Sequence, residues 1–307
     1  MFKYRLIIKL IFVMFLFSTT YAEIIIKYKI NDEIITNFDI EYEANYLVFL
    51  RPELKKLSKE DLLKISENSL IREIIKNKEL IKVYKNIENI NFEKQIANKL
   101  IKFKNLDNSD QLKKIIKKNN LNYEDIINKM KNENLWNDLI TRKYGSLVKI
   151  DKEKLKKELL LKLKNNKKFE YNLSELLFDI DKNDELEKKY DEIKKFISEN
   201  NFKNAVSKYS LANSSKNGGD IGWIKETLLS KDLISILNKV EISGITKPIK
   251  YPNGYLILKL NNKKNMKQII DIDKELQEVI KFETNKQLNQ FSLLYYKKLK
   301  QNTIIYE

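Results

Sequence analysis

The 307-residue sequence contains no histidine and no cysteine, and it has only six glycines and three prolines. Histidine and cysteine bind most protein zinc and other transition metals, so we expect neither a metal site of ordinary type nor a cofactor. Without cysteine no disulfide can support the fold, which must depend on its hydrophobic core. Without histidine, catalysis by an imidazole acid or base is excluded. The Gly218-Gly219 pair opens no phosphate-binding loop or dinucleotide motif.

The first 22 residues have the pattern of a secretion signal. An apolar run over residues 10–17 follows three positively charged residues, Lys3, Arg5 and Lys9. The run is shorter than the roughly 20 residues that cross a bilayer, and small residues precede Ala22. The pattern therefore predicts cleavage after Ala22, rather than an uncleaved anchor, and export to a periplasm.

The net charge of +16 comes from outside residues 169–262, which hold equal numbers of acidic and basic residues. Basic proteins often bind nucleic acid, but an exported protein rarely meets it, so no nucleic-acid partner is expected. Two interpretations stay open. In the first, the lysines only cover solvated faces of a chain rich in Lys, Ile and Asn. In the second, they attract acidic clients and make peripheral contact with an anionic membrane.

Three parts follow the signal. Residues 23–168 predict a two-stranded hairpin at 23–36 and then helices with long apolar stripes, without a glycine between Ile24 and Tyr144. Residues 169–262 hold most of the glycines and predict strands at 170–180, 245–249 and 255–260 around a helical middle. After a polar break, residues 263–307 predict one long amphipathic helix. A lone helix is marginal in water, so we expect it to dock on the N-terminal helices, with Thr303–Tyr306 pairing beside the hairpin.

Four motifs in residues 169–262 occur in a characteristic order. They are Ser174-Glu-Leu-Leu177, Gly218-Gly-Asp-Ile-Gly-Trp223, Glu241-Ile-Ser-Gly-Ile-Thr-Lys-Pro248 and Gly254-Tyr-Leu-Ile-Leu258. Together they resemble the parvulin-type (PpiC) prolyl isomerase domain, and the whole chain resembles the SurA-like periplasmic chaperones. The resemblance implies an α+β protein: a mainly helical N-terminal chaperone module, completed by the C-terminal helix, with one inserted parvulin-like domain.

The catalytic positions depart from the family pattern that this resemblance implies. Glu175 and Leu256 stand where parvulins carry histidines, and Ala212 stands at the usual Cys or Asp. Isomerisation must lower a barrier of roughly 18–20 kcal/mol by stabilising a twisted amide, and an ionised Glu175 accepts but does not donate hydrogen bonds. We expect no catalytic residues and little or no isomerase activity.

The proline pocket of the family corresponds here to apolar residues. They are Ile221, Trp223, Leu229 and Leu233. These residues form either a retained peptide-binding groove or only the core of the domain. The core interpretation is favoured for Leu233, and for Leu229 both interpretations stay open.

Two functions are consistent with the resemblance. One is an ATP-independent periplasmic chaperone that binds unfolded outer-membrane proteins; the alternative is an active prolyl isomerase with an altered site. In the chaperone hypothesis, Tyr46, Phe49 and Trp136 are candidate client contacts, although their helical spacing favours the core. The oligomeric state is not indicated.

Overall fold

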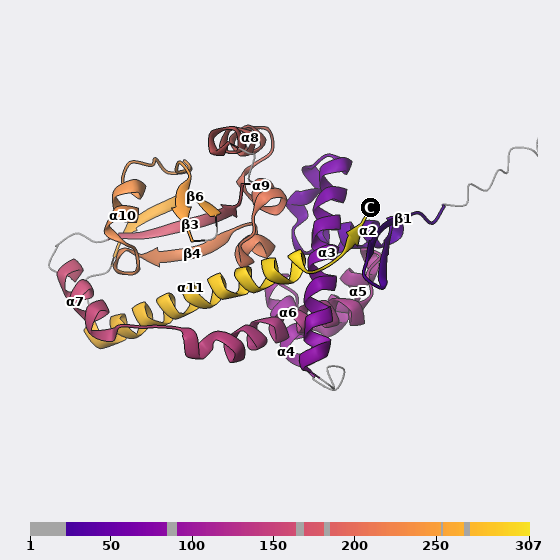
Figure 1. The fold of residues 1–307 in the computed structure, drawn as a ribbon, viewed down its shortest axis with the longest axis horizontal. Coiled ribbons are helices and arrows are strands. Elements are labelled where there is room, and N and C mark those ends of the chain that lie inside the picture. Colours follow the sequence, from indigo (N-terminus) through magenta and orange to yellow (C-terminus); the bar gives the residue numbers. More distant parts are fainter. Residues whose placement is uncertain (1–22, 85–90, 164–168, 181–184, 253, 267–270) are drawn as a thin grey trace, which may run out of the picture.

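The computed structural model describes residues 23–84, 91–163, 169–180, 185–252, 254–266 and 271–307. The predicted signal peptide lies outside these residues. The described chain has the expected α+β architecture, with a helical part and a sheet part connected by the long C-terminal helix (Figure 1). Within the described residues, no helix has the length and apolar character needed to cross a bilayer.

A small antiparallel sheet opens the helical part. Strands β1 (Ile26–Ile30), β2 (Glu33–Thr36) and β7 (Ile305–Tyr306) lie in the order β2-β1-β7. The chain alternates apolar side chains, so Tyr28, Ile30 and Ile35 are buried against helix α3 while their neighbours face outward. The pairing of β7 with β1 confirms the prediction that the C-terminus returns to the hairpin.

The helices of this part begin at the capping residues visible in the sequence. Thr36 forms a capping box with Asp39, and Ser58 accepts a hydrogen bond from Asp61 N. The elements are α2 (Asn37–Leu50), η1 (Pro52–Lys56), α3 (Lys59–Val83), α4 (Glu93–Phe103), α5 (Ser109–Lys118), α6 (Tyr123–Tyr144), η3 (Gly145–Leu147) and α7 (Lys152–Leu163).

The sheet part is a four-stranded antiparallel sheet in the order β4-β3-β6-β5. Its strands are β3 (Phe169–Phe178), β4 (Asp220–Lys225), β5 (Ile249–Tyr251) and β6 (Gly254–Asn265). The helical elements between them are α8 (Leu186–Glu199), α9 (Phe202–Tyr209), η4 (Asn213–Asn217), η5 (Glu226–Leu228) and α10 (Lys231–Leu237).

Three sequence predictions for this sheet are wrong in detail. No strand is predicted between residues 180 and 245, but β4 lies there and pairs with β3 along its length. The strand expected at 245–249 begins only at Ile249, and Ile245 makes an isolated bridge. The polar run after Leu260 does not break β6, because its backbone pairs with Phe169–Asn172 beyond a bulge. Backbone pairing outweighed the polar composition.

One hydrophobic core spans both parts of the molecule. Leu176, Phe178 and Ile257, from one face of the large sheet, pack with α8 and α9 and also against the helical part. The helical part contributes four buried side chains, namely Leu47, Leu54, Leu57 and Ile65. The two parts are therefore packed together through apolar contacts, which the sequence alone could not indicate.

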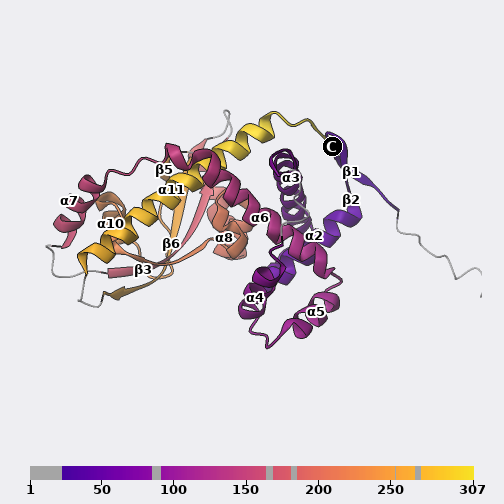
Figure 2. The same ribbon diagram turned by 90° about the horizontal axis from the view of Figure 1, so that it is seen from below.

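Helix α11 (Ile272–Gln301) lies along both parts (Figures 1 and 2). Toward its C-terminal end, Tyr295 stacks on Trp136 with ring centres 5.7 Å apart, and Trp136 Nε1 donates to Ser292 Oγ at 2.9 Å. Phe282 and Leu293 pack instead on the large sheet. The N-terminal module was the expected host of this helix; the structure shows the sheet to be a second one.

Candidate functional site

The candidate site lies on the face of the large sheet opposite α8 and α9. Leu173, Leu177 and Leu258 of β3 and β6 form its floor. Five of the residues singled out in the sequence join this apolar cluster or pack against it, namely Ala212, Ile221, Leu229, Leu233 and Leu256. We call this set, with its floor, the sheet cluster. The sequence motifs thus converge on one place in the fold.

Glu175 is the polar group that β3 presents beside the sheet cluster. Ser214 Oγ donates a hydrogen bond of 2.8 Å to its carboxylate. Burial raises the pKa of Glu175, and the bond from Ser214 opposes this effect. A protonated carboxyl can donate as well as accept a hydrogen bond, so the pair is the most chemically versatile feature of this face.

The loop that carries Ser214 is held against β3 by a close backbone approach. Glu175 N donates to the carbonyl of Gly219 at 2.7 Å. Gly219 has φ +81°, and a Cβ there would lie 2.3 Å from the Glu175 carbonyl oxygen. Only glycine fits such a position, so the Gly-Gly motif has a geometric role in placing Ser214 beside Glu175.

Leu256 and Ala212 fill the other two catalytic positions implied by the family resemblance. Both are 8% exposed, and Leu256 lies opposite Leu177 in the β3–β6 pairing. Neither side chain donates or accepts a hydrogen bond. The nearby Ser210 hydroxyl accepts from Leu177 N and Ala212 N, both at 3.2 Å, so it serves the backbone.

The four candidate peptide-binding residues do not lie together. Leu229 is buried, Ile221 and Leu233 are half-buried, and all three belong to the sheet cluster. Trp223 lies outside it, 41% exposed, with the Lys264 ammonium 4.1 Å from its ring centre. Leu233 packs against the core cluster, as favoured from the sequence, and Leu229, left undecided there, is the more deeply buried of the two.

Helix α11 covers part of this face, which the sequence did not reveal. Phe282 and Leu293 pack into the sheet cluster, and Asn213 Nδ2 donates to Asn289 Oδ1 at 3.1 Å. Tyr251, beside the cluster, bonds to Gln290; burial raises its pKa. The length of the helix could have indicated this second contact. At 1.5 Å per residue, its 30 residues span about 45 Å, which is longer than docking on one small module requires.

The candidate client contacts in the helical part are core residues. Phe49 is 4% exposed and Trp136 is fully buried, in two separate clusters. Tyr46 packs partly buried between two clusters. In the described ranges no group of three or more carboxylates could hold a metal ion.

Comparison with known proteins identifies the sheet part. Residues 172–262 match the family model described as "Rotamase: PPIC-type PPIASE domain". The chain is 24% identical over 163 residues to Chaperone SurA of Pseudomonas putida, a match that covers 50% of this chain and 38% of the relative. Residues 172–262 thus form a PpiC-type domain, and the chain is similar to the SurA chaperones.

A second PpiC relative is the periplasmic chaperone PpiD of Buchnera aphidicola subsp. Schizaphis graminum. It is 37% identical over 94 residues, which are 30% of this chain and 14% of the relative. The chain thus matches well under two thirds of the length of either relative. Among solved structures, a SurA-like chaperone of Campylobacter jejuni aligns over 92% of this chain and 98% of its own, with 17% identity and a TM-score of 0.36.

Proposed function

We propose that this protein is an ATP-independent periplasmic chaperone that binds unfolded outer-membrane proteins and that its PpiC domain lacks appreciable isomerase activity. The names of its relatives, Chaperone SurA and Periplasmic chaperone PpiD, support the chaperone assignment. In this proposal the signal peptide is residues 1–22, residues 23–168 with 263–307 form the chaperone module, and residues 169–262 form the inserted domain.

One observation supports the loss of isomerase activity most directly. Two catalytic positions of the PpiC domain carry the buried apolar side chains of Ala212 and Leu256, and the protein's own helix α11 packs on the same cluster. A proline-containing peptide at this face would lack the usual polar partners, and it would compete with Phe282 and Leu293 for apolar surface.

The small sheet offers a better surface for clients. Its outer face aligns Ile34, Lys29 and Tyr306 across the three strands. Ile34 is 52% and Tyr306 61% exposed, and the start of β1 and the segments that lead into β1 and β7 carry further exposed apolar side chains, namely Ile24, Ile25, Ile26 and Ile304. Apolar groups gathered on an exposed face indicate an interaction surface. We propose that unfolded, strand-forming clients bind at this outer face.

The chaperone proposal is tested by the aggregation of an unfolded porin diluted from urea, followed by light scattering. The protein should suppress aggregation, and the double variant Ile34→Ser, Tyr306→Ser should suppress it at least threefold less at equal concentration. Phe103→Ser, an equally exposed apolar position on α4, is the matched control. If the parent protein does not suppress porin aggregation, the proposed function is wrong. If the parent suppresses aggregation and the double variant suppresses it equally well, the proposed client surface is wrong.

The second candidate, an active isomerase with an altered site, is favoured by the Glu175–Ser214 pair. A carboxyl with a raised pKa could donate a hydrogen bond where an imidazole donates in the family. The test is the rate of cis–trans isomerisation of a proline tetrapeptide, compared with an ordinary parvulin. We expect no acceleration above background, and Glu175→Gln should change nothing. Parvulin-like acceleration that Glu175→Gln abolishes would establish the alternative.

We also propose a periplasmic location for the cleaved protein, with peripheral contact to anionic membrane as a secondary interaction. Export and cleavage after Ala22 predict a mature protein that begins at Glu23. The intact mass of the exported protein measures this. A mass that retains residues 1–22 would instead indicate a membrane-tethered foldase.

A further inference from the structure

A charged cavity of about 120 Å³ lies where the helical part meets the PpiC domain. Helices α2, α3 and α6 line it from one side, and residues Ser207–Lys216 line it from the other. Its walls carry five cations and three carboxylates: Arg51, Arg72, Lys76, Lys129 and Lys216 against Glu43, Glu73 and Glu133. The lining therefore has two more positive than negative charges, in a partly desolvated space.

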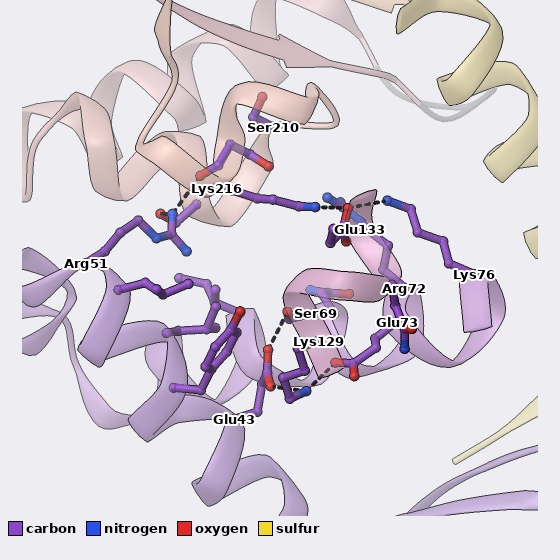
Figure 3. A pocket seen from close by; sticks show the side chains of 18 of the residues that line it. Glu43, Arg51, Ser69, Arg72, Glu73, Lys76, Lys129, Glu133, Ser210 and Lys216 are labelled. Atoms are coloured by element: carbon purple, nitrogen blue, oxygen red, sulfur yellow. Dashed lines mark hydrogen bonds and ion pairs between the residues drawn. The ribbon is translucent and has the colours of Figure 1, made fainter. Parts of the chain in front are cut away.

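The carboxylates are already engaged with lysines (Figure 3). Lys129 bridges Glu43, at 2.9 Å, and Glu73. Lys216 and Lys76 approach Glu133 from opposite sides, with Lys76 Nζ at 3.4 Å. Each carboxylate thus has a cation, and these ion pairs leave none for the two arginines.

Arg51 and Arg72 are the cations without an acidic partner. Arg51, 7% exposed, donates only to neutral oxygens: Ser207 Oγ at 2.5 Å and the Ser215 carbonyl at 2.8 Å. In the described part of the chain, no carboxylate lies within ion-pair distance of either guanidinium, and neither buried Nε has a hydrogen-bond partner. An unpaired buried charge is costly, so the surroundings of Arg51 favour an added anion. Arg72 is half-buried, with its guanidinium carbon 5.7 Å from the Tyr296 ring centre.

Burial also shifts the pKa of two of the lining cations. Burial lowers the pKa of Arg51 to about 10, although Glu53 and Glu43 act in the opposite sense. Burial also lowers the pKa of Lys76 to about 8; Glu133 opposes that effect, while Lys216 and Arg72 reinforce it by repulsion.

We propose that this cavity is a binding site for a small oxyanion, a carboxylate or a phosphate, held by Arg51, Arg72 and Lys216. Guanidinium groups match the planar fork of a carboxylate and the oxygens of phosphate. A cavity of this volume has room for several water molecules and can therefore hold one such group. Because Arg72 and Lys216 come from the two parts of the molecule, the anion would bridge them. The site does not depend on the proposed chaperone activity.

The test uses the intrinsic fluorescence of Trp136, because Lys76 Nζ lies 5.1 Å from its ring centre. The chain has two tryptophans, so Trp223→Phe leaves Trp136 as the single reporter. Sodium phosphate is titrated at constant ionic strength made up with chloride. We expect a saturable change, and Arg72→Gln should raise the half-saturating concentration at least tenfold. Lys250→Gln, an exposed cation outside the cavity, should leave it unchanged.

Two further ligands distinguish the source of the anion. An acetylated dipeptide with a free C-terminal carboxylate is compared with its amide. Saturation by the acid but not the amide identifies a polypeptide terminus, and saturation by phosphate alone identifies an inorganic anion; both support the site. If Arg72→Gln misfolds, the midpoint temperature of thermal unfolding of the parent is measured instead. This midpoint should be higher in phosphate than in chloride at the same ionic strength. No saturable change with either ligand, or equal binding by a folded Arg72→Gln, would overturn the proposal.

Discussion

At the scale of single residues, the polar chemistry of this protein is concentrated at the junction of its two parts. Glu133 of α6 meets Lys216 from the PpiC domain and Lys76 from α3. Burial alone would raise the pKa of Glu133, but Lys216 and Lys76 outweigh burial and lower it to about 2. By contrast, the Glu175–Ser214 pair contains no cation, and there burial prevails. The balance between burial and cationic partners therefore decides the direction of each pKa shift.

This difference predicts a pH dependence of stability. Because the pKa of Glu133 falls from 4.5 to about 2 on folding, its stabilisation is complete above pH 4.5 and is lost as the pH falls toward 2. Glu133→Gln should lower the free energy of unfolding at pH 7 by about 1–3 kcal/mol and flatten its decline below pH 4.5. Urea unfolding at pH 7, 4.5 and 3 measures both effects.

The control for this prediction is Glu124→Gln, an exposed carboxylate on the same helix. It should unfold with the parent's pH dependence. An unaltered decline below pH 4.5 in Glu133→Gln would show that the two lysines do not hold the charged form.

At the scale of elements, α11 has two roles that its sequence pattern does not separate. Its C-terminal half stacks Tyr295 on Trp136 in the helical part, and Phe282 and Leu293 pack on the sheet cluster. Near its N-terminus, Lys225 of β4 pairs with Glu275 at 2.8 Å and with Glu278 at 2.5 Å. The helix thereby connects a strand of the PpiC domain to the helical part.

Two adjacent leucines of α11 allow a sharp test of this connection. Leu293 is 8% exposed and Leu294 is 49% exposed. Leu293→Ala should lower the free energy of unfolding by about 2–5 kcal/mol, because it leaves a cavity in the sheet cluster. Leu294→Ala, with the same chemistry, should change it by less than about 0.5 kcal/mol. Equal effects in urea denaturation would mean that α11 does not pack on the PpiC domain as described.

At the scale of the whole molecule, one apolar core unites the two parts. Leu54, fully buried, lies in the same cluster as Phe178 and Ile257 of the sheet. Lys208 of α9 also bonds to Asp61 of α3 at 2.5 Å. A client that binds the helical part would therefore meet a PpiC domain already fixed in place, rather than one carried on a loose linker.

The shared core predicts coupled unfolding. Leu54→Ala should lower the free energy of unfolding by about 2–5 kcal/mol and reduce hydrogen-exchange protection in both α3 and β3. Leu112→Ala removes an equally buried leucine from a cluster that belongs to the helical part alone, so its effect should be largest in α4 and α5. Hydrogen exchange read by mass spectrometry separates the cases. Loss of protection confined to α3 in Leu54→Ala would contradict the coupling.

The sequence by itself determined what depends on local pattern. Capping residues such as Thr36 and Ser58, and the alternation of β1, specify elements through contacts between near neighbours. The Gly-Gly motif indicated the PpiC sheet through its resemblance to the family, and the structure supplies the reason for Gly219, where a Cβ would lie 2.3 Å from the Glu175 carbonyl oxygen. The absence of histidine is likewise a property of the sequence alone, and it supports the proposal that isomerase activity is low.

Only the tertiary structure decided which surfaces meet. Strand β4 forms because β3 supplies its partner, and Trp223 turns away from the sheet cluster although Ile221 joins it. The docking of α11 on the PpiC domain and the charged cavity around Arg51 and Arg72 both arise from residues far apart in the chain. An apolar stripe or a lysine has the same local signature whichever partner it meets, and long-range packing alone selects that partner.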